Sequence, residues 1–185
     1  MDGEAIGLTA AGIGRDETDE ARLATLFDAH HQRLYRLARR LSASTDEARD
    51  LVQETFLRVA NRPGGIPRNV ESEEAWLVRV LVNVARNEWR KQKGRRRLEQ
   101  RHLHEVTVAP PSRPDVATVA HDTVWHAMRQ LPPRRRAALI LHELEGATVP
   151  RIAQFLGVSP ITVRWHLAQG RRDLARIIDP GRKKS

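Results

Sequence analysis

Two helix-start signals with a glycine between them lie close together near the C-terminal end of the chain, and this pattern limits the fold more than any other feature. Thr148 and Ser159 are each followed within two residues by a proline, the arrangement of an N-cap residue with proline in the first helical turn. Gly157 stands between them, where glycine accepts the left-handed backbone that ends a helix. The pattern predicts two helices joined by a tight turn.

The second of these helices is expected to have an apolar inner stripe and a polar outer face. Val163, Leu167 and Leu174 recur at helical spacing, and the polar set consists of Ser159, Thr162, Arg164, His166, Gln169 and Arg171. Trp165 has two interpretations, which are contact with a DNA sugar or thymine methyl group and burial against Val124 or Trp125. The caps, the turn glycine and the basic face favour a DNA-binding helix-turn-helix over an ordinary helical hairpin.

The remaining chain shows the three- and four-residue spacing of amphipathic helices and no strand pattern. Helices are predicted over 21–41, 44–59 and 73–93. Ser44 and Glu47 form a capping box for the second of them, and Ser72 is expected to cap the third. The predicted fold class is all-α, with two small helical domains joined by a flexible linker.

Charge and proline content divide the chain into five segments. They are a flexible acidic arm over 1–20, a first helical domain over 21–94, a linker over 95–118, a second helical domain over 119–179 and a basic tail over 180–185. The linker contains Pro110, Pro111 and Pro114, which stiffen an extended segment and interrupt helical periodicity. The helix-turn-helix falls in the second domain.

Composition narrows the classes of function. The formal net charge is +9 with a sequence pI of about 11.1, and because residues 1–20 are acidic the rest of the chain is still more basic. Such a balance favours a polyanionic partner, although a GC-rich genome would produce the same excess of arginine over lysine. The chain has no cysteine, so disulfides and thiolate zinc sites are excluded within it. No signal peptide or membrane span is visible, and we expect a cytoplasmic protein.

No catalytic constellation is found in the sequence. A nucleophile with a base and an orienting acid is missing, as are a phosphate-binding glycine loop and any metal-ligand spacing around the histidines. The chain is therefore not expected to be an enzyme or to hold a cofactor. An RNA-modifying enzyme with a basic helical surface would need such a cluster.

Several segments together resemble a known family. The segment 46–59 is similar to the core of region 2 of sigma-70-type sigma factors, and 75–80 with Asn83 is similar to the helix that reads the −10 promoter element. The segments 131–137 and 145–174 resemble region 4. The chain is identified as a member of the extracytoplasmic-function (ECF) group, because the connection between the two blocks is too short for a region 3 domain.

The resemblance implies three binding surfaces. Core RNA polymerase, through the clamp helices of β′ and also the β subunit, would meet Asp46, Asp50, Gln53, Glu54 and Leu57. The melted −10 DNA would meet Asn69, Arg79, Asn83, Arg86, Asn87, Arg90 and Lys91. The −35 duplex would meet Ser159, Thr162, Arg164, Trp165, His166, Gln169 and Arg171. An anti-sigma protein is a further partner that the family implies.

The sequence departs from the family pattern in the helix expected to read the −35 element. Trp165 and His166 stand where the family commonly has a small residue and an arginine, Gln169 replaces another frequent arginine, and Gly170 lies inside the helix. The DNA sequence preference therefore stays open. The alternative function is a stand-alone dimeric helix-turn-helix regulator, which would bind a symmetric site without polymerase.

Overall fold

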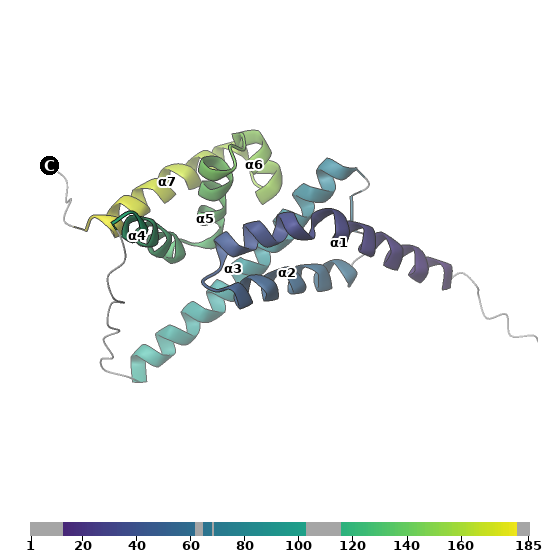
Figure 1. Cartoon of the computed structure of the whole chain (residues 1–185), viewed down its shortest axis with the longest axis horizontal. Helices are drawn as coiled ribbons and strands as arrows, with labels where there is room; N and C mark the ends of the chain where they lie inside the picture. The colour runs from purple at the N-terminus through teal and green to yellow at the C-terminus, as the bar shows by residue number, and fades with distance from the viewer. Residues whose placement is uncertain (1–12, 62–64, 68, 103–115, 181–185) are drawn as a thin grey trace, which may run out of the picture.

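The computed structural model describes residues 13–61, 65–67, 69–102 and 116–180. Its elements are α1 (Ile13–Leu41), α2 (Thr45–Ala60), α3 (Val70–His102), α4 (Val116–Gln130), α5 (Pro133–Leu139), the π-helical turn η2 (Ile140–Leu144), α6 (Val149–Leu156) and α7 (Pro160–Ile178). Within these described ranges the chain forms helices, turns and no strand (Figure 1). The predicted all-α class is confirmed.

The first three helices form one bundle. The link between α1 and α2 is short, and the capping box predicted there is present, since Ser44 Oγ accepts from the Glu47 amide at 3.1 Å. The Glu47 carboxylate in turn accepts from the Ala43 amide at 2.8 Å. The long helix α3 crosses this pair and buries Leu77 and Leu81 completely (Figure 1).

The cap of α3 differs from the prediction. Asn69 Oδ1 accepts from the Ser72 amide at 2.7 Å, so Asn69 begins the helix three residues before the expected cap at Ser72. Both residues are of the types that favour an N-cap, and the local sequence alone does not choose between them. Asn69, expected to be a DNA contact, therefore has a structural role.

The ends of α1 and α3 also differ from the predicted segments. Helix α3 continues to His102, where the sequence predicted an end near Lys93, because no proline stands before Pro110 to stop it. Helix α1 begins at Ile13, inside the segment assigned to the acidic arm. The rest of the arm, most of the linker and the basic tail lie outside the described residues.

The helix-turn-helix formed by α6 and α7 follows the predicted local pattern. Thr148 Oγ1 accepts from the Arg151 amide at 3.4 Å, and Ser159 Oγ accepts from the Thr162 amide at 3.1 Å. Gly157 ends α6 with a φ of 62°, in the left-handed region. Both caps and the turn glycine are confirmed.

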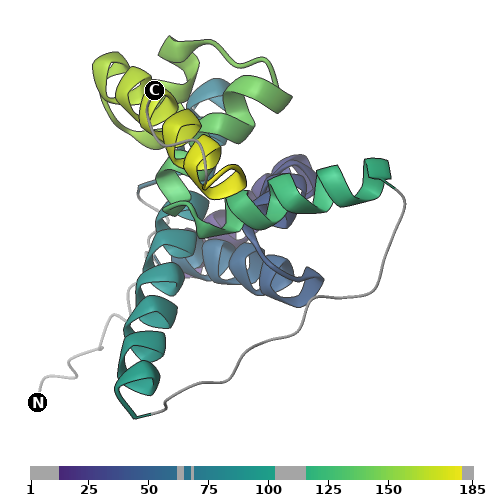
Figure 2. The same ribbon diagram turned by 90° about the vertical axis from the view of Figure 1, so that its left-hand side faces the viewer.

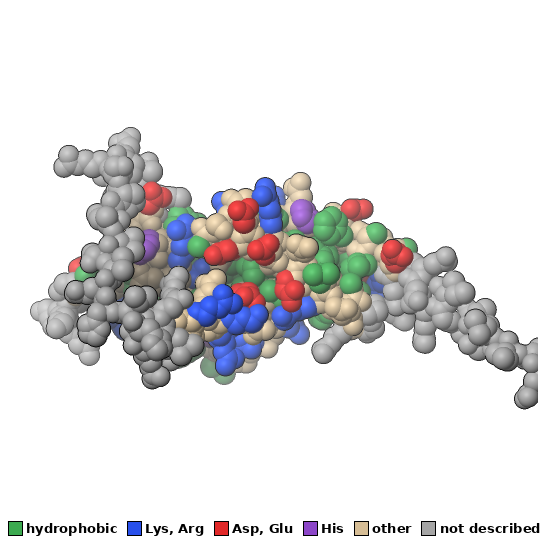
Figure 3. Space-filling model, turned by 90° about the horizontal axis from the view of Figure 1, so that it is seen from below, with side chains coloured by type: hydrophobic (Ala, Val, Ile, Leu, Met, Phe, Trp, Pro, Cys, Tyr) green, Lys and Arg blue, Asp and Glu red, His purple; other side chains and the backbone are tan. Residues whose placement is uncertain are grey.

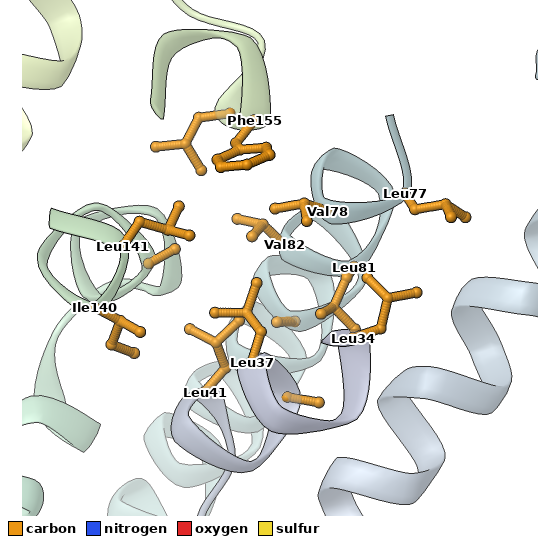
Figure 4. Close-up of a cluster of buried hydrophobic side chains, with 14 of the residues drawn as sticks. Leu34, Leu37, Leu41, Leu77, Val78, Leu81, Val82, Ile140, Leu141 and Phe155 are labelled. Atoms are coloured by element: carbon orange, nitrogen blue, oxygen red, sulfur yellow. The ribbon is translucent and has the colours of Figure 1, made fainter. Parts of the chain in front are cut away.

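The two helical groups pack directly against each other. Val78 and Val82 of α3 face Phe155 of α6 and Leu141 of η2 (Figure 4), and all four side chains are buried. Figures 1 and 2 both place α6 beside the N-terminal part of α3. The buried hydrophobic residues of both groups belong to one continuous core. The groups are thus joined by a packed interface in addition to the covalent connection.

Candidate nucleic-acid interface

The exposed side of α7 is a single stripe along the second helix of the helix-turn-helix. As far as Arg172, its members are solvent-exposed and recur every three or four residues: Ile161, Arg164, Trp165, Ala168, Arg171 and Arg172. Ile161 is 76% exposed and Trp165 is 50% exposed, although both are large and apolar. The stripe combines apolar side chains in its first half with arginines along its length.

The exposed face of α7 differs from the prediction at one residue and includes others that were not predicted. His166 is only 9% exposed, so the prediction that it points outward is wrong. Burial and the charges of Arg135 and Arg134 lower the pKa of His166. Ile161, Ala168 and Arg172 lie on the exposed face but were not predicted there.

A close approach between α5 and α7 explains this burial. Gly170 is buried, and a Cβ atom at that position would lie 2.9 Å from Leu139 Cδ1. The missing side chain lets α5 pack tightly over α7 and cover more of its surface than the apolar spacing indicates. The glycine inside the helix, which looked like a departure from the family, was the available signal for this contact.

Ser159, Thr162, Gln169 and Arg171, which belong to the predicted −35 set, have polar partners within the chain. Gln169 is half-buried and donates to Asp173 Oδ1 at 3.0 Å. Arg171 pairs with Glu143 at 2.6 Å, and both side chains are about half exposed. The hydroxyl groups of Ser159 and Thr162 lie 2.9 Å apart at the start of α7.

Trp165 is held at the surface by charged neighbours. The guanidinium group of Arg135 lies 5.0 Å from the centre of the Trp165 ring, within the range of a cation–π contact. Arg135 is itself fixed by Asp173, with Nη1 and Oδ2 2.6 Å apart. Trp165 as a whole is 50% exposed, so the ring is not fully buried and part of it is open to a ligand.

The polar side of α3 contacts the second helical group, although the side chain of Arg79 stays exposed to solvent. Arg79 Nη2 donates to the Gln154 carbonyl of α6 at 2.8 Å, and the Arg79 guanidinium lies against the Gly157 turn. Arg134 of α5 donates to Asn83 Oδ1 at 3.3 Å. Burial and the charge of Arg86 lower the pKa of Arg134. Three residues expected to contact −10 DNA, Arg79, Asn83 and Arg86, therefore lie at or beside this contact.

The remaining residues of the predicted −10 set are not gathered with these three. Asn87 is half-buried, whereas Arg90 and Lys91 are exposed further along α3. Lys91 Nζ pairs with Glu88 Oε1 at 2.7 Å. The predicted −10 residues therefore fall into two groups. Arg79, Asn83 and Arg86 lie at or beside the contact with the second helical group, and Asn87, Arg90 and Lys91 lie beyond it.

The outward side of α2 is acidic and accessible. Asp46, Asp50, Gln53 and Leu57 are exposed, and Glu54 is partly exposed and pairs with Arg58 at 2.7 Å. Seen from below, this part of the molecule presents acidic side chains beside apolar ones (Figure 3). A groove of about 660 Å³ between α1 and α2 adjoins it and is lined by Phe27, Tyr35, Val52, Phe56 and Leu57, among others. The combination of acids and an apolar groove suits a protein partner better than DNA.

The described residues contain no group of three or more histidine or acidic side chains that could hold a metal ion. In the same part of the chain, no helix combines the length and apolarity required to cross a bilayer.

Comparisons with known proteins place the two helical groups in one family. The family model Sigma-70 region 2 matches residues 26–95, and the model Sigma-70, region 4 matches residues 121–174. The ECF RNA polymerase sigma factor SigE of Mycolicibacterium smegmatis is 35% identical over 80% of this chain, and the match spans 58% of that relative. SigM of Mycobacterium tuberculosis is 31% identical over 83% of this chain and 75% of its own length.

Solved structures agree on the fold. The sigma factor RpoE in complex with the anti-sigma factor NepR from Bartonella quintana matches 88% of this chain and 98% of its own, with a TM-score of 0.50 and 22% identity. CnrH in complex with the cytosolic domain of CnrY matches 90% of this chain and 93% of its own, with a TM-score of 0.56 and 20% identity.

The chain belongs to the ECF group of sigma-70 family RNA polymerase sigma factors. Members of this family are transcription initiation factors and not enzymes, so the predicted class of function is confirmed. The alternative of a stand-alone dimeric regulator is wrong.

Proposed function

We propose that this sigma factor binds core RNA polymerase in the cytoplasm through the exposed side of α2, places α7 in the major groove of the −35 element, and holds the melted −10 strand with α3. The observation that carries this proposal is the exposed stripe of α7, which is apolar and basic and follows a capped turn in the geometry of a recognition helix.

The α2 surface supports the polymerase-binding role. Its acids stand on a chain with a formal charge of +9, where they would repel nucleic acid. Leu57 is 51% exposed beside them, and the groove between α1 and α2 offers more apolar surface. Apolar contacts with a charged rim are typical of protein interfaces. We assign Asp46, Asp50, Gln53, Glu54 and Leu57 to this docking surface.

The α7 surface supports the −35 role. Arg164, Arg171 and Arg172 are exposed on it, and an arginine that bonds a guanine edge with two hydrogen bonds contributes about 1–3 kcal/mol of discrimination. Ser159 and Thr162 stand at the N-terminus of α7, where backbone amides attract a DNA phosphate. The described geometry fits major-groove binding.

The −10 role requires the two helical groups to separate. Elements about 25 base pairs apart lie roughly 85 Å from each other along a duplex with about 3.4 Å per step. In this structure α3 and α6 are in contact, with Arg79 bonded to the Gln154 carbonyl. The contact must therefore open before both elements are bound. The arginines of α3 would then face phosphates, and Asn83 and Asn87 would face unpaired bases.

An anti-sigma protein is part of the proposal. The structures of RpoE and CnrH that share this fold were each solved with a second protein, which is an anti-sigma factor in the case of RpoE. The groove between α1 and α2 and the neighbouring acids give such a partner the same docking surface that polymerase needs. Competition for this surface would keep the chain from polymerase.

The division of labour is tested with two double variants. Asp50→Ala with Glu54→Ala is expected to weaken association with core polymerase about tenfold or more, because the docking surface loses two charges that complement its partner. Arg164→Ala with Arg172→Ala is expected to spare core association and to reduce initiation at −35-dependent promoters by a similar factor. Asp28→Ala, an exposed acid on α1, is the control. If both double variants lost core association, or both lost only initiation, the assignment of α2 to polymerase and α7 to the −35 element would be contradicted.

A further inference from the structure

The first half of the α7 face carries two large apolar side chains that the protein core does not use. Ile161 is 76% exposed and Trp165 is 50% exposed. They are four residues apart, so they lie on the same side of the helix, and the exposed Ala168 follows in the same line. The buried Val163 and Leu167 already supply the inner stripe of this helix. Ile161 and Trp165 are therefore available for a ligand.

The indole ring is fixed before any ligand arrives. Arg135 lies 5.0 Å from the ring centre and is bonded to Asp173 at 2.6 Å, while the His166 ring meets Trp165 edge-on with centroids 5.0 Å apart. A side chain held in one place loses little conformational entropy on binding. The exposed part of the ring is thus a preformed apolar surface beside the arginines of α7.

Major-groove chemistry indicates what this surface meets. Of the groups that base pairs present in the major groove, the 5-methyl group of thymine is the apolar one. Residues in the N-terminal half of a recognition helix approach the base edges most closely. We infer that Ile161 and Trp165 contact thymine methyl groups and make thymine a required base at their positions in the −35 element. This inference rests on the proposed −35 role of α7.

Replacing thymine by uracil tests the inference, because uracil lacks only the methyl group and keeps every hydrogen-bonding group. Core polymerase carrying the full chain would first select −35 duplexes from a library with randomised bases. Each thymine of the selected duplex would then be replaced singly by uracil. We expect binding to weaken about fourfold at one or two positions, the effect of losing one buried methyl group.

Variants of the chain identify which side chain is responsible. Trp165→Ser and Ile161→Ser, both at exposed positions, are each expected to remove the uracil effect at one position. Ile178→Ser is the matched control, because Ile178 is an exposed apolar residue at the other end of the same helix and should leave the uracil effect unchanged.

The outcomes separate this inference from the proposed function. Selection of a −35 sequence without any uracil effect would overturn the methyl contact, and so would a uracil effect that persists in both serine variants. Weaker binding of Trp165→Ser with no dependence on uracil would overturn it in favour of a sugar contact. If core polymerase with this chain selects no −35 sequence, the proposed function itself fails.

Discussion

Two helices of this protein are assigned to promoter DNA, and the structure treats them differently. The face of α7 is open to solvent along its length, with Arg164 and Trp165 exposed. The corresponding part of α3 is held by the second helical group, since the exposed Arg79 donates to α6 and the half-buried Asn83 accepts from α5. The helix proposed to bind the −35 duplex is therefore free of contacts between the two groups, whereas the helix proposed to bind the −10 strand has two of its side chains engaged in them. We expect the contact between the two groups to reduce the access of −10 DNA to Arg79 and Asn83 and to leave α7 unaffected.

The cover over α3 has an apolar centre. Phe155 is 3% exposed, and burying a side chain of this kind contributes about 1.5–3 kcal/mol. It contacts the region of Val78 and Val82, which would be exposed to water if α6 moved away (Figure 4). Separation of the groups therefore has a free-energy cost that binding to polymerase and promoter must offset.

A chain of ion pairs surrounds this centre. Glu74 of α3 pairs with Arg151 of α6 and Arg33 of α1, and Glu145 pairs with Arg33 and Arg40. Pairs with this exposure contribute up to about 1 kcal/mol each. The buried Arg136 of α5 adds a hydrogen bond of 2.5 Å to the Leu41 carbonyl at the end of α1. The contact is thus both apolar and electrostatic.

The largest effect on DNA binding is expected from reversing the charge of Glu145. Glu145→Arg removes two ion pairs and places a third cation beside Arg33 and Arg40, so the groups should separate more easily. We expect the free chain to bind a single-stranded −10 oligonucleotide about tenfold more tightly, measured by fluorescence anisotropy. Affinity for a −35 duplex should change little, because α7 is already open.

Asp28→Arg is the control for that experiment, since it makes the same change of charge at an exposed position of α1. It should raise the affinity for the oligonucleotide far less. If small-angle scattering shows that Glu145→Arg expands the protein and the −10 oligonucleotide still binds no more tightly, contact with the second group does not limit DNA binding by α3.

An effect on stability, with little effect on DNA binding, is expected at the turn that contacts Arg79. Gly157 has a φ of 62°, and an added Cβ would lie 2.6 Å from Arg79 Nε. Gly157→Ala should lower the free energy of unfolding by about 1–2 kcal/mol from backbone strain alone, with a further loss from displacing Arg79. Denaturant unfolding of the variant measures the sum.

The same substitution in an Arg79→Ala background isolates the contribution of the contact. There the penalty should fall to the strain alone, because the guanidinium is gone. An equal penalty in both backgrounds would show that Arg79 does not occupy the turn in solution.

The smallest effect is expected on the pH dependence of stability, from the buried His166 on the inner side of α7. Burial and the charges of Arg135 and Arg134 lower the pKa of His166 in the folded protein, whereas an unfolded histidine titrates near about 6.5. The unfolded chain therefore takes up more protons as the pH falls through that value, and stability is lost on acidification. His166→Gln should flatten the decline in unfolding free energy between pH 7 and pH 5.

The same variant tests whether His166 contributes to −35 recognition by the exposed face of α7. His166→Gln should leave −35 affinity within about twofold of the parent, since the side chain is buried and makes no direct DNA contact. A tenfold loss of sequence preference would return His166 to the reading face and contradict the burial.

The local features of the fold could be predicted because they depend on neighbouring residues. The caps at Thr148 and Ser159 and the left-handed Gly157 each follow from residue type and position along a few residues. The exposed acids of α2 were found in the same way, since helical spacing alone places them opposite the apolar stripe.

Features that depend on contacts between distant segments were not predicted. Val78 and Val82 are buried because Phe155, more than seventy positions away, covers them, and no periodicity within α3 indicates that second packed side. His166 is buried for a similar reason, because Leu139 reaches the surface of α7 at Gly170. Such pairings are set by tertiary packing, which the amphipathic pattern of a single helix does not contain.

The continuation of α3 to His102 limits how far apart the two groups can travel. A helix advances about 1.5 Å per residue, whereas extended chain advances about 3.4 Å. Each helical residue at the end of α3 therefore shortens the maximum distance that the connection can span. Fully extended chain between His102 and Val116 would reach at most about 50 Å, a little over half of what the whole segment 95–118 would allow. If α7 and α3 bind the −35 and −10 elements as proposed, the short connection is expected to set an upper limit on the spacing between the two elements that one chain can bind at once.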